Sequence, residues 1–260
     1  MTRKHGNEDD QVKDLENGNV YFFYRPRVGD EEPESVAEIQ RLYMVLSPHG
    51  KQRYRLMVIG HKKLPDPSRS GQGRLWGFVD QVTDDPKAIE RDLQAHRYST
   101  KTRGEQVLPA ARPAGEGVYR IIRHDSHTHL VYALELPEEP DEVQEALNIE
   151  AEANYILSIK NPAKPSSRGT GFAGQKAAKY PQRLMQMFRD RQFSEADPID
   201  LLDYPHAQFM MIAVAEDVSD DLGIELHPQY ETEATAEIIN DLKMEKSKHP
   251  LEPLFEGKWA

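Results

Sequence analysis

Arg120-Ile-Ile-Arg-His-Asp-Ser-His-Thr-His-Leu-Val-Tyr-Ala-Leu-Glu-Leu136 is the stretch of sequence that indicates the fold most directly. Its two apolar runs, 118–125 and 127–137, are rich in β-branched and aromatic residues, which favours strands. Asp125-Ser126 lies between them and has the composition of a tight turn. The stretch therefore predicts an antiparallel hairpin whose tip lies at 124–127.

The same hairpin raises the question of a metal site. In a strand, His127 and His129 point to one face because side chains alternate. With the carboxylate of Asp125 they would form a set of three ligands that suits a divalent metal. The turn chemistry of Asp125-Ser126 and the lack of any other histidine motif favour a plain hairpin with histidines on its wet face. The metal site stays as the alternative, and a single histidine acting as an acid–base group or ligand contact is a third reading.

Similar apolar runs recur along the chain and predict a mixed fold. Strands are expected over 19–28, 41–48, 53–65, 74–82, 154–162 and 207–215. Helices are expected over 86–97, about 176–190 and 232–246, the first beginning with the Asp85-Pro86 start signal. We expect an α+β protein with mainly antiparallel sheets or a partly open barrel, and with these helices flanking its faces.

Composition suggests five successive segments. They are a disordered tail (1–18), an N-terminal β-rich lobe (19–98), a connector (99–117), a second β-rich lobe (118–215) and an acidic C-terminal helix with a docking tail (216–260). An internal duplication is one hypothesis for the two lobes, because Pro67–Gly73 resembles Pro165–Gly171 in a Ser/Arg/Gly loop. A competing register pairs 31–40 with 138–147, and chance similarity in a Glu-rich chain explains both.

The composition also limits the class of protein. None of the 260 residues is cysteine, so disulfides and thiolate chemistry are excluded and a cytoplasmic location is expected. No window approaches the 18 or so consecutive apolar residues of a membrane span, so no membrane partner is expected. No Gly-x-Ser-x-Gly motif is present, and the sequence leaves open whether the protein is an enzyme.

Charge is strongly segregated within a chain of net charge −11. The segment from His49 to Arg74 contains seven Lys/Arg and one acidic residue, and the segment from Lys160 to Arg191 contains eight Lys/Arg and one acidic residue. From Glu195 onward there are 16 acids and 4 bases. Such segregation indicates either an anionic ligand or pairing of the acidic and basic segments within the fold.

The second basic segment contains Gly169-Thr-Gly-Phe-Ala-Gly174, which has the spacing of a dinucleotide-binding turn. Pro162 and Pro165 separate it from the preceding strand, so a Rossmann turn is not expected. A Gly-rich loop with hydroxyls and nearby cations can still cradle a phosphate group, although a surface linker has the same composition. The residues expected to bind an anion are Arg69, Arg168, Thr170, Lys176, Lys179 and Arg183.

The leading functional hypothesis is therefore non-enzymatic binding of an anionic ligand, either a phosphate-containing molecule or a nucleic acid. The alternatives are a metal-dependent enzyme centred on His127 and His129 and a protein–protein scaffold. No cofactor is expected apart from the divalent metal of the first alternative. Asp203-Tyr-Pro-His206, just ahead of an expected strand, is a further conceivable site, for which a turn is the simpler interpretation.

Overall fold

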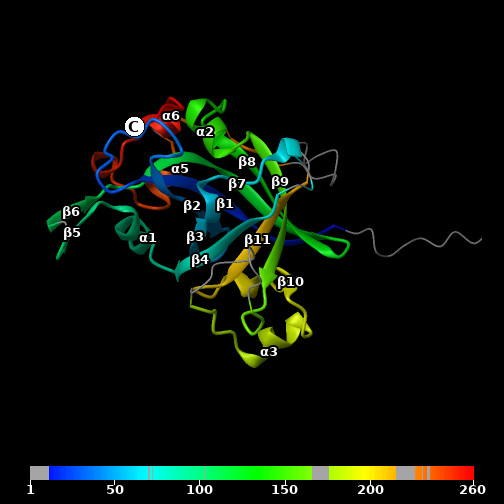
Figure 1. The fold of residues 1–260 in the computed structure, drawn as a ribbon. Coiled ribbons are helices and arrows are strands. Elements are labelled where there is room, and N and C mark those ends of the chain that lie inside the picture. Colours follow the sequence, from blue (N-terminus) through cyan, green and yellow to red (C-terminus); the bar gives the residue numbers. More distant parts are fainter. Residues whose placement is uncertain are drawn as a thin grey trace, which may run out of the picture.

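Figure 1 shows the computed structural model, in which the strands wrap around into a closed antiparallel barrel. The structure describes residues 12–69, 71, 73–102, 104–165, 176–214, 226–229, 231–232 and 235–260. The strands of the barrel are β1 (Lys13–Pro26), β2 (Ile39–Pro48), β3 (Tyr54–Ile59), β4 (Leu75–Thr83), β7 (Arg112–His124), β8 (His127–Leu136), β9 (Glu152–Lys160) and β11 (Gln208–Ala213).

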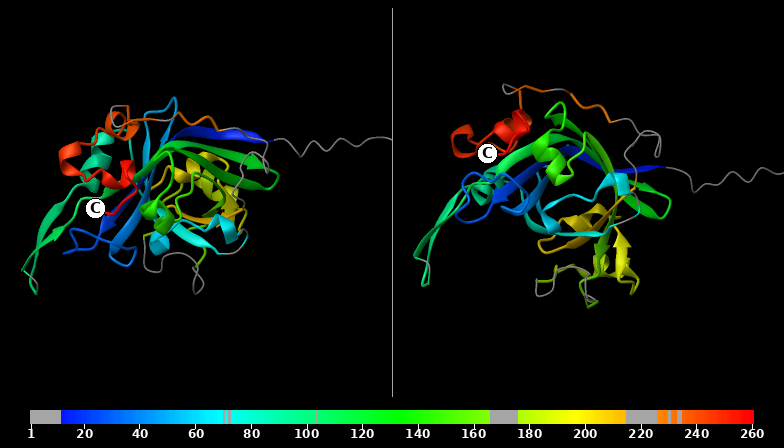
Figure 2. Two further views of the ribbon diagram at one scale, coloured as in Figure 1. Left: turned by 90° about the horizontal axis from the view of Figure 1, so that it is seen from above. Right: turned by 45° about the horizontal axis from the view of Figure 1, so that its top comes forward.

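The order of the strands shows how the barrel closes. Around the barrel it is β1-β2-β3-β4-β11-β9-β8-β7, and β7 pairs with β1 to complete the ring. A short additional strand, β10 (Phe193–Glu195), extends the pairing of β9 beyond the end of β8. Two further strands, β5 (His96–Thr100) and β6 (Gly104–Leu108), form a separate hairpin, which projects from the barrel as an arm in Figure 2.

Side chains alternate between the lumen and the outside of the barrel, as the pleat of a strand requires. Val20, Phe22 and Tyr24 of β1 point into the lumen, where one apolar cluster draws on all eight strands. Tyr21 and Phe23 point outward and belong to a second cluster on the outer face of β1 to β4. Because both faces of β1 are buried, its sequence is a continuous apolar run without alternation.

Short helices and the C-terminal segment cover this outer face. The helices on this face are α1 (Pro86–Leu93), α5 (Glu237–Asn240) and α6 (Glu252–Phe255). Two others, α2 (Glu142–Leu147) and α3 (Gln182–Met185), place Val143, Leu147 and Leu184 in the lumen cluster instead. Ile89 of α1, Ile238 of α5 and Leu254 of α6 all belong to the outer cluster. Figure 2 shows the C-terminal segment in red against this side of the barrel.

The expectation of an α+β fold with flanking helices is wrong, because the chain is a mostly β closed barrel. Three long helices were expected. The one expected over 86–97 is only α1, because the backbone at Gln94 is extended and leads into the β5–β6 arm. The helix expected over 176–190 is only α3 and one 3₁₀ turn, after which Arg189 adopts a left-handed φ of 46°. The helix expected over 232–246 is only α5.

The C-terminal segment loses its helix because tertiary contacts outweigh local propensity. Tyr21 and Tyr54 donate hydrogen bonds to the carboxylate of Asp241 at 2.8 and 2.9 Å. Lys243 adopts a φ of 56°, which interrupts a helix. The apolar residues with helical spacing are buried on the barrel by an irregular chain instead.

Several expected elements are confirmed and several boundaries are corrected. The β7–β8 hairpin pairs His124 with His127, and Asp125 in its turn has a φ of 52°. β1 begins at Lys13, so 13–18 is strand rather than disordered tail. The expected connector, 99–117, contains most of the arm and the start of β7, because Arg112 and its neighbours pair with β1.

Both expected lobes contribute to one barrel, as successive meanders β1-β2-β3-β4 and β7-β8-β9-β11. Pro67–Gly73 and Pro165–Gly171 are 98 residues apart, and the second of these loops lies largely outside the described residues. At the same offset, Val20 points into the lumen, whereas Val118 lies next to lumen-facing Tyr119 and so points outward. These two valines therefore do not occupy equivalent positions.

Candidate functional site

The structure pairs arginines of the first basic segment with carboxylates. Arg55 is fully buried, with Nε donating to Asp203 Oδ1 at 2.7 Å and Nη2 donating to Glu16 Oε2 at 3.0 Å. Arg53 forms an ion pair with the other oxygen of Asp203. Burial raises the pKa of Glu16, but its hydrogen bond and ion pair with Arg55 outweigh that effect and the pKa is lowered. These cations are neutralised within the fold.

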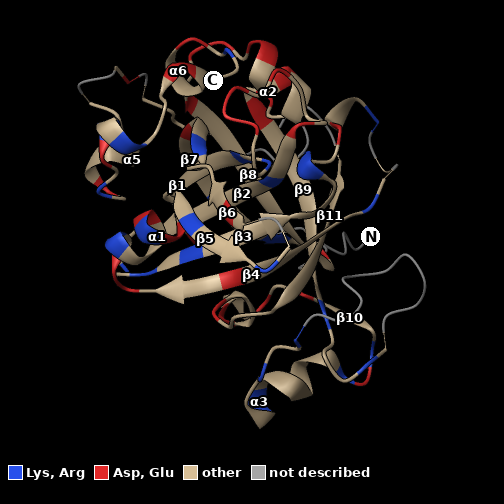
Figure 3. Cartoon of the chain, turned by 60° about the vertical axis from the view of Figure 1, so that its left-hand side comes forward, with Lys and Arg blue, Asp and Glu red and all other residues tan. Residues whose placement is uncertain are grey.

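Much of the second basic segment is paired in the same way. Arg183 lies 2.8 Å from Asp200, and Arg191 lies 3.2 Å from Glu195. Acidic residues that follow this segment in the chain therefore neutralise part of it, as one of the two hypotheses on charge segregation requires. In the described part of the chain, Lys176 and Lys179 have no ion pair. Figure 3 shows the basic residues of this region around α3 in blue.

The two unpaired lysines line one cavity of about 680 Å³. Its lining consists of Lys176, Ala177, Ala178, Lys179, Tyr204, Pro205 and His206. None of these described lining residues is an aspartate or a glutamate. The cavity is therefore electropositive within an acidic protein.

The position of the lysines follows from the residues between and after them. Ala178 is buried, and the hydroxyl of Tyr180 donates to the carbonyl oxygen of Leu201 at 2.9 Å. The rings of Tyr180 and Tyr204 meet edge to face at 5.1 Å between centroids. These contacts hold the extended chain at 176–180 against the turn 203–206, and both lysine side chains remain exposed.

The opposite wall is the turn that leads into β11. The backbone N–H of His206 donates to the carbonyl oxygen of Val79 at 2.6 Å, and the residue adopts a φ of 69°. Its ring atom Nδ1 is buried and has no hydrogen-bond partner. Asp203 at the start of the turn is held by Arg53 and Arg55, so its charge is already neutralised. The wall thus offers a phenol and an imidazole but no free negative charge.

The expected anion-binding residues have different places in the structure. Lys176 and Lys179 lie together in the cavity, whereas Arg183 pairs with Asp200 outside its lining. Arg69 pairs with Asp66 at 3.3 Å on an exposed turn and does not line this cavity. Arg168 and Thr170 lie outside the described residues, as does the Gly-rich loop 169–174.

Tyr204 and His206 are the wall residues for which the sequence favoured a turn without function. The sequence signal was present, because Asp203-Tyr-Pro-His206 stood out as a polar group ahead of a strand. Only the tertiary structure brings this group to Lys176, because the two segments are separated by α3 and β10 in the chain.

The histidines of the β7–β8 hairpin form a different arrangement from the metal set considered above. The ring atom Nδ1 of buried His129 lies 2.9 Å from Asn154 Oδ1 on the neighbouring strand β9. His127 is exposed, and Asp125 lies in the turn. Among the described residues no group of three His, Asp or Glu side chains is placed to hold a metal ion, and Asp125, His127 and His129 are not such a group.

No family model, curated protein or solved structure matches this chain. In the part of the chain that the structure describes, no helix is long and apolar enough to cross a membrane.

Proposed function

We propose that the protein binds a phosphate-containing anionic ligand in the cavity between Lys176, Lys179 and the turn at Tyr204–His206. The observation that carries this proposal is a pair of lysines that, among the described residues, have no ion-pair partner and share a lining free of carboxylates. Lysine ammonium groups are compact donors that suit phosphate oxygens. A volume of about 680 Å³ is within the usual range for small-molecule sites.

The rest of the lining suits a ligand that also has an apolar or planar part. Ala177 and Ala178 on one wall and Pro205 on the other add apolar atoms to the lining, and Tyr204 adds an aromatic ring. The imidazole of His206 adds one polar side chain to the lining. A nucleotide combines these features, since its phosphates meet the lysines and its base meets the aromatic wall.

Isothermal titration with ADP, inorganic pyrophosphate and a short single-stranded oligonucleotide tests the proposal. Replacing both lysines (Lys176→Gln/Lys179→Gln) should weaken ADP binding by at least about tenfold, since each charge-assisted hydrogen bond contributes about 1.5–3 kcal/mol. The matched control Lys87→Gln/Lys101→Gln removes two exposed lysines elsewhere and should change the affinity less than about twofold.

Two results would overturn the proposal. One is that the unmodified protein binds none of the three probes. The other is an equal loss of affinity in the cavity variant and in the control, which would mean that overall charge, and not this cavity, governs binding.

A further inference from the structure

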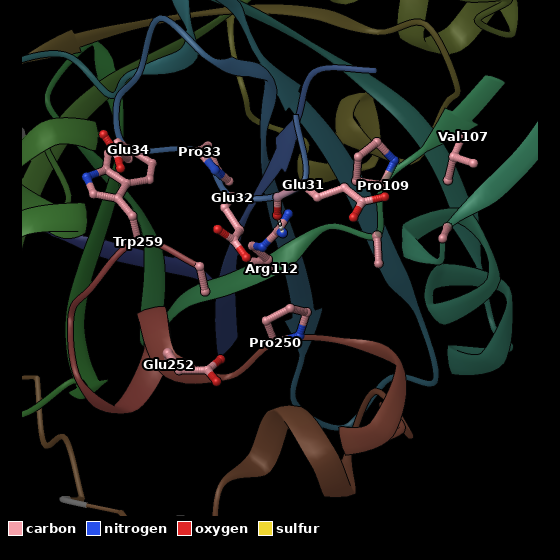
Figure 4. Close-up of a pocket in the computed structure, with 13 residues that line it drawn as sticks. Glu31, Glu32, Pro33, Glu34, Val107, Pro109, Arg112, Pro250, Glu252 and Trp259 are labelled. Atoms are coloured by element: carbon pink, nitrogen blue, oxygen red, sulfur yellow. Dashed lines mark hydrogen bonds between the residues drawn. The ribbon is translucent and has the colours of Figure 1, made fainter. Parts of the chain in front are cut away.

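A second cavity, of about 730 Å³, lies at a place in the fold where three segments meet. Its walls come from the β1–β2 loop at Glu31–Glu34, from the chain between β6 and β7, and from the C-terminal residues after 249. Figure 4 shows these residues around the opening, with Arg112 at its centre. None of the residues that line the cavity at Lys176 and Lys179 belongs to it.

Carboxylates dominate the rim of this second cavity. Glu31, Glu32, Glu34 and Glu252 are all exposed, and within the described residues none of them has an ion-pair partner. Their charges add up because no cation among the lining residues other than Arg112 opposes them. Such a rim attracts a cationic group.

Arg112 adds a positive charge and hydrogen-bond donors to the lining of this cavity. Its side chain is almost fully buried, with 5% of the residue exposed. Nη2 donates to the backbone carbonyl oxygen of Glu31, but Nε and Nη1 have no acceptor. Burial lowers the pKa of this guanidinium, while Tyr24 and three nearby glutamates, Glu252 first among them, act against that effect. Two nitrogens of this buried guanidinium thus have no acceptor, and a carboxylate could supply one.

The remaining wall is apolar and firmly held. Trp259 packs its ring edge to face against buried Tyr24, with 5.2 Å between the ring centroids. Pro33, Pro109 and Pro250, which lie around the opening in Figure 4, add further apolar rings. The aliphatic part of a ligand can therefore lie against rings while its polar ends meet the charged groups.

We propose that this cavity binds a small amphoteric molecule, of which a basic amino acid is the simplest example. The ammonium or guanidinium groups of the ligand face Glu32, Glu34 and Glu252 at the rim. Its carboxylate accepts hydrogen bonds from Nε and Nη1 of Arg112. Both donors are closed to solvent here, so binding requires a local displacement beside Glu31, whose carbonyl oxygen accepts from Nη2 of the same guanidinium.

Isothermal titration with L-arginine and with agmatine tests the two halves of the proposal separately, because agmatine is arginine without its carboxylate. The unmodified protein should bind L-arginine at least about fivefold more tightly than agmatine, since only arginine has an acceptor for Arg112. The variant Arg112→Gln should bind the two ligands equally. Arg112→Lys keeps the charge and should retain part of the preference for arginine.

The rim is tested with a pair of double variants. Glu32→Gln/Glu252→Gln should weaken the binding of both ligands by about tenfold. The control Glu138→Gln/Glu139→Gln removes the same charge from exposed positions outside the cavity and should leave both affinities unchanged.

Three results would overturn the inference. These are a lack of binding of both ligands, equal affinity for arginine and agmatine in the unmodified protein, and an unaltered affinity in the rim variant. The first two need no substitution, so they decide the matter even if circular dichroism shows that Arg112→Gln does not fold. ADP binding at the lysine cavity is measured in the same variants and should not change, which keeps the two sites distinguishable.

Discussion

Arg55 and Glu16 form an ion pair inside the lumen of the barrel, where their side chains are 0% and 3% exposed. The hydroxyl of Tyr119 donates to Glu16 at 2.9 Å, and Asp203 approaches the other side of the guanidinium. The pair thus joins β1, β3 and the turn that forms one wall of the lysine cavity. It places a hydrogen-bonded ion pair among the mainly apolar side chains of the lumen cluster.

Removing one member of this network should destabilise the barrel strongly. Arg55→Met leaves the carboxylates of Glu16 and Asp203 without their common partner, and breaking a buried pair in this way costs about 3–5 kcal/mol. The free energy of unfolding, measured by urea denaturation, checks this expectation. The control Arg97→Met breaks an exposed contact with Glu105 at 3.9 Å and should cost less than about 1 kcal/mol. Equal effects of the two substitutions would contradict a structural role for the lumen pair.

The docking of the C-terminal segment should depend on pH through Glu135. Burial raises the pKa of this carboxyl to about 7, with further contributions from Glu237 and Glu231, although the N–H of Gln229 opposes the shift. The N–H of Gln229 donates to the carboxyl at 2.6 Å. Because the pKa is higher in the folded protein, this contribution to stability is complete below about pH 4.5 and is lost as pH rises through 7.

The measurement is the free energy of unfolding at pH 5 and at pH 8, for the unmodified protein and for Glu135→Gln. Each pKa unit between the folded and unfolded chain corresponds to about 1.4 kcal/mol. The difference between the two proteins should therefore change with pH by at least that amount, and the variant should lose less stability on going to pH 8. Parallel profiles would show that Glu135 titrates as it does in the unfolded chain.

Replacing either of two glycines of β7 by alanine should lower the stability of the protein by different amounts. A Cβ atom at Gly117 would lie 2.1 Å from the backbone carbonyl oxygen of Ala133, which cannot move away without breaking the β7–β8 pairing. A Cβ at Gly115 would meet side-chain atoms of Leu134 and Phe22 at 3.3 Å, and side chains can adjust. Gly117→Ala should cost at least about 2 kcal/mol and Gly115→Ala less.

Thermal melting monitored by circular dichroism compares these two variants directly. A smaller loss of stability in Gly117→Ala than in Gly115→Ala would mean that β7 and β8 do not approach each other at Gly117 as the structure has them.

Sequence reasoning located the strands because their signal is local. Apolar runs with aromatic or β-branched residues predicted β2, β3, β4, β8, β9 and β11, and turn residues predicted the turn at Asp125, since each of these depends on a few neighbouring residues. The same reasoning failed for the helices around 176–190 and 232–246. Their apolar spacing fits a helix, but an irregular chain buries those residues on the barrel instead. In the second segment it also places Asp241 where two tyrosine hydroxyls donate hydrogen bonds to its carboxylate.

The sequence by itself determined the strand content, the lack of thiol chemistry and the charge segregation of this protein. Tertiary structure alone decided that the strands close into one barrel, because closure depends on pairing β1 with β7 and β8 with β9 across long separations. It also decided which cations remain unpaired. Arg55 and Lys176 are both basic residues in sequence, but only the fold brings Asp203 to the first and leaves the second facing a cavity.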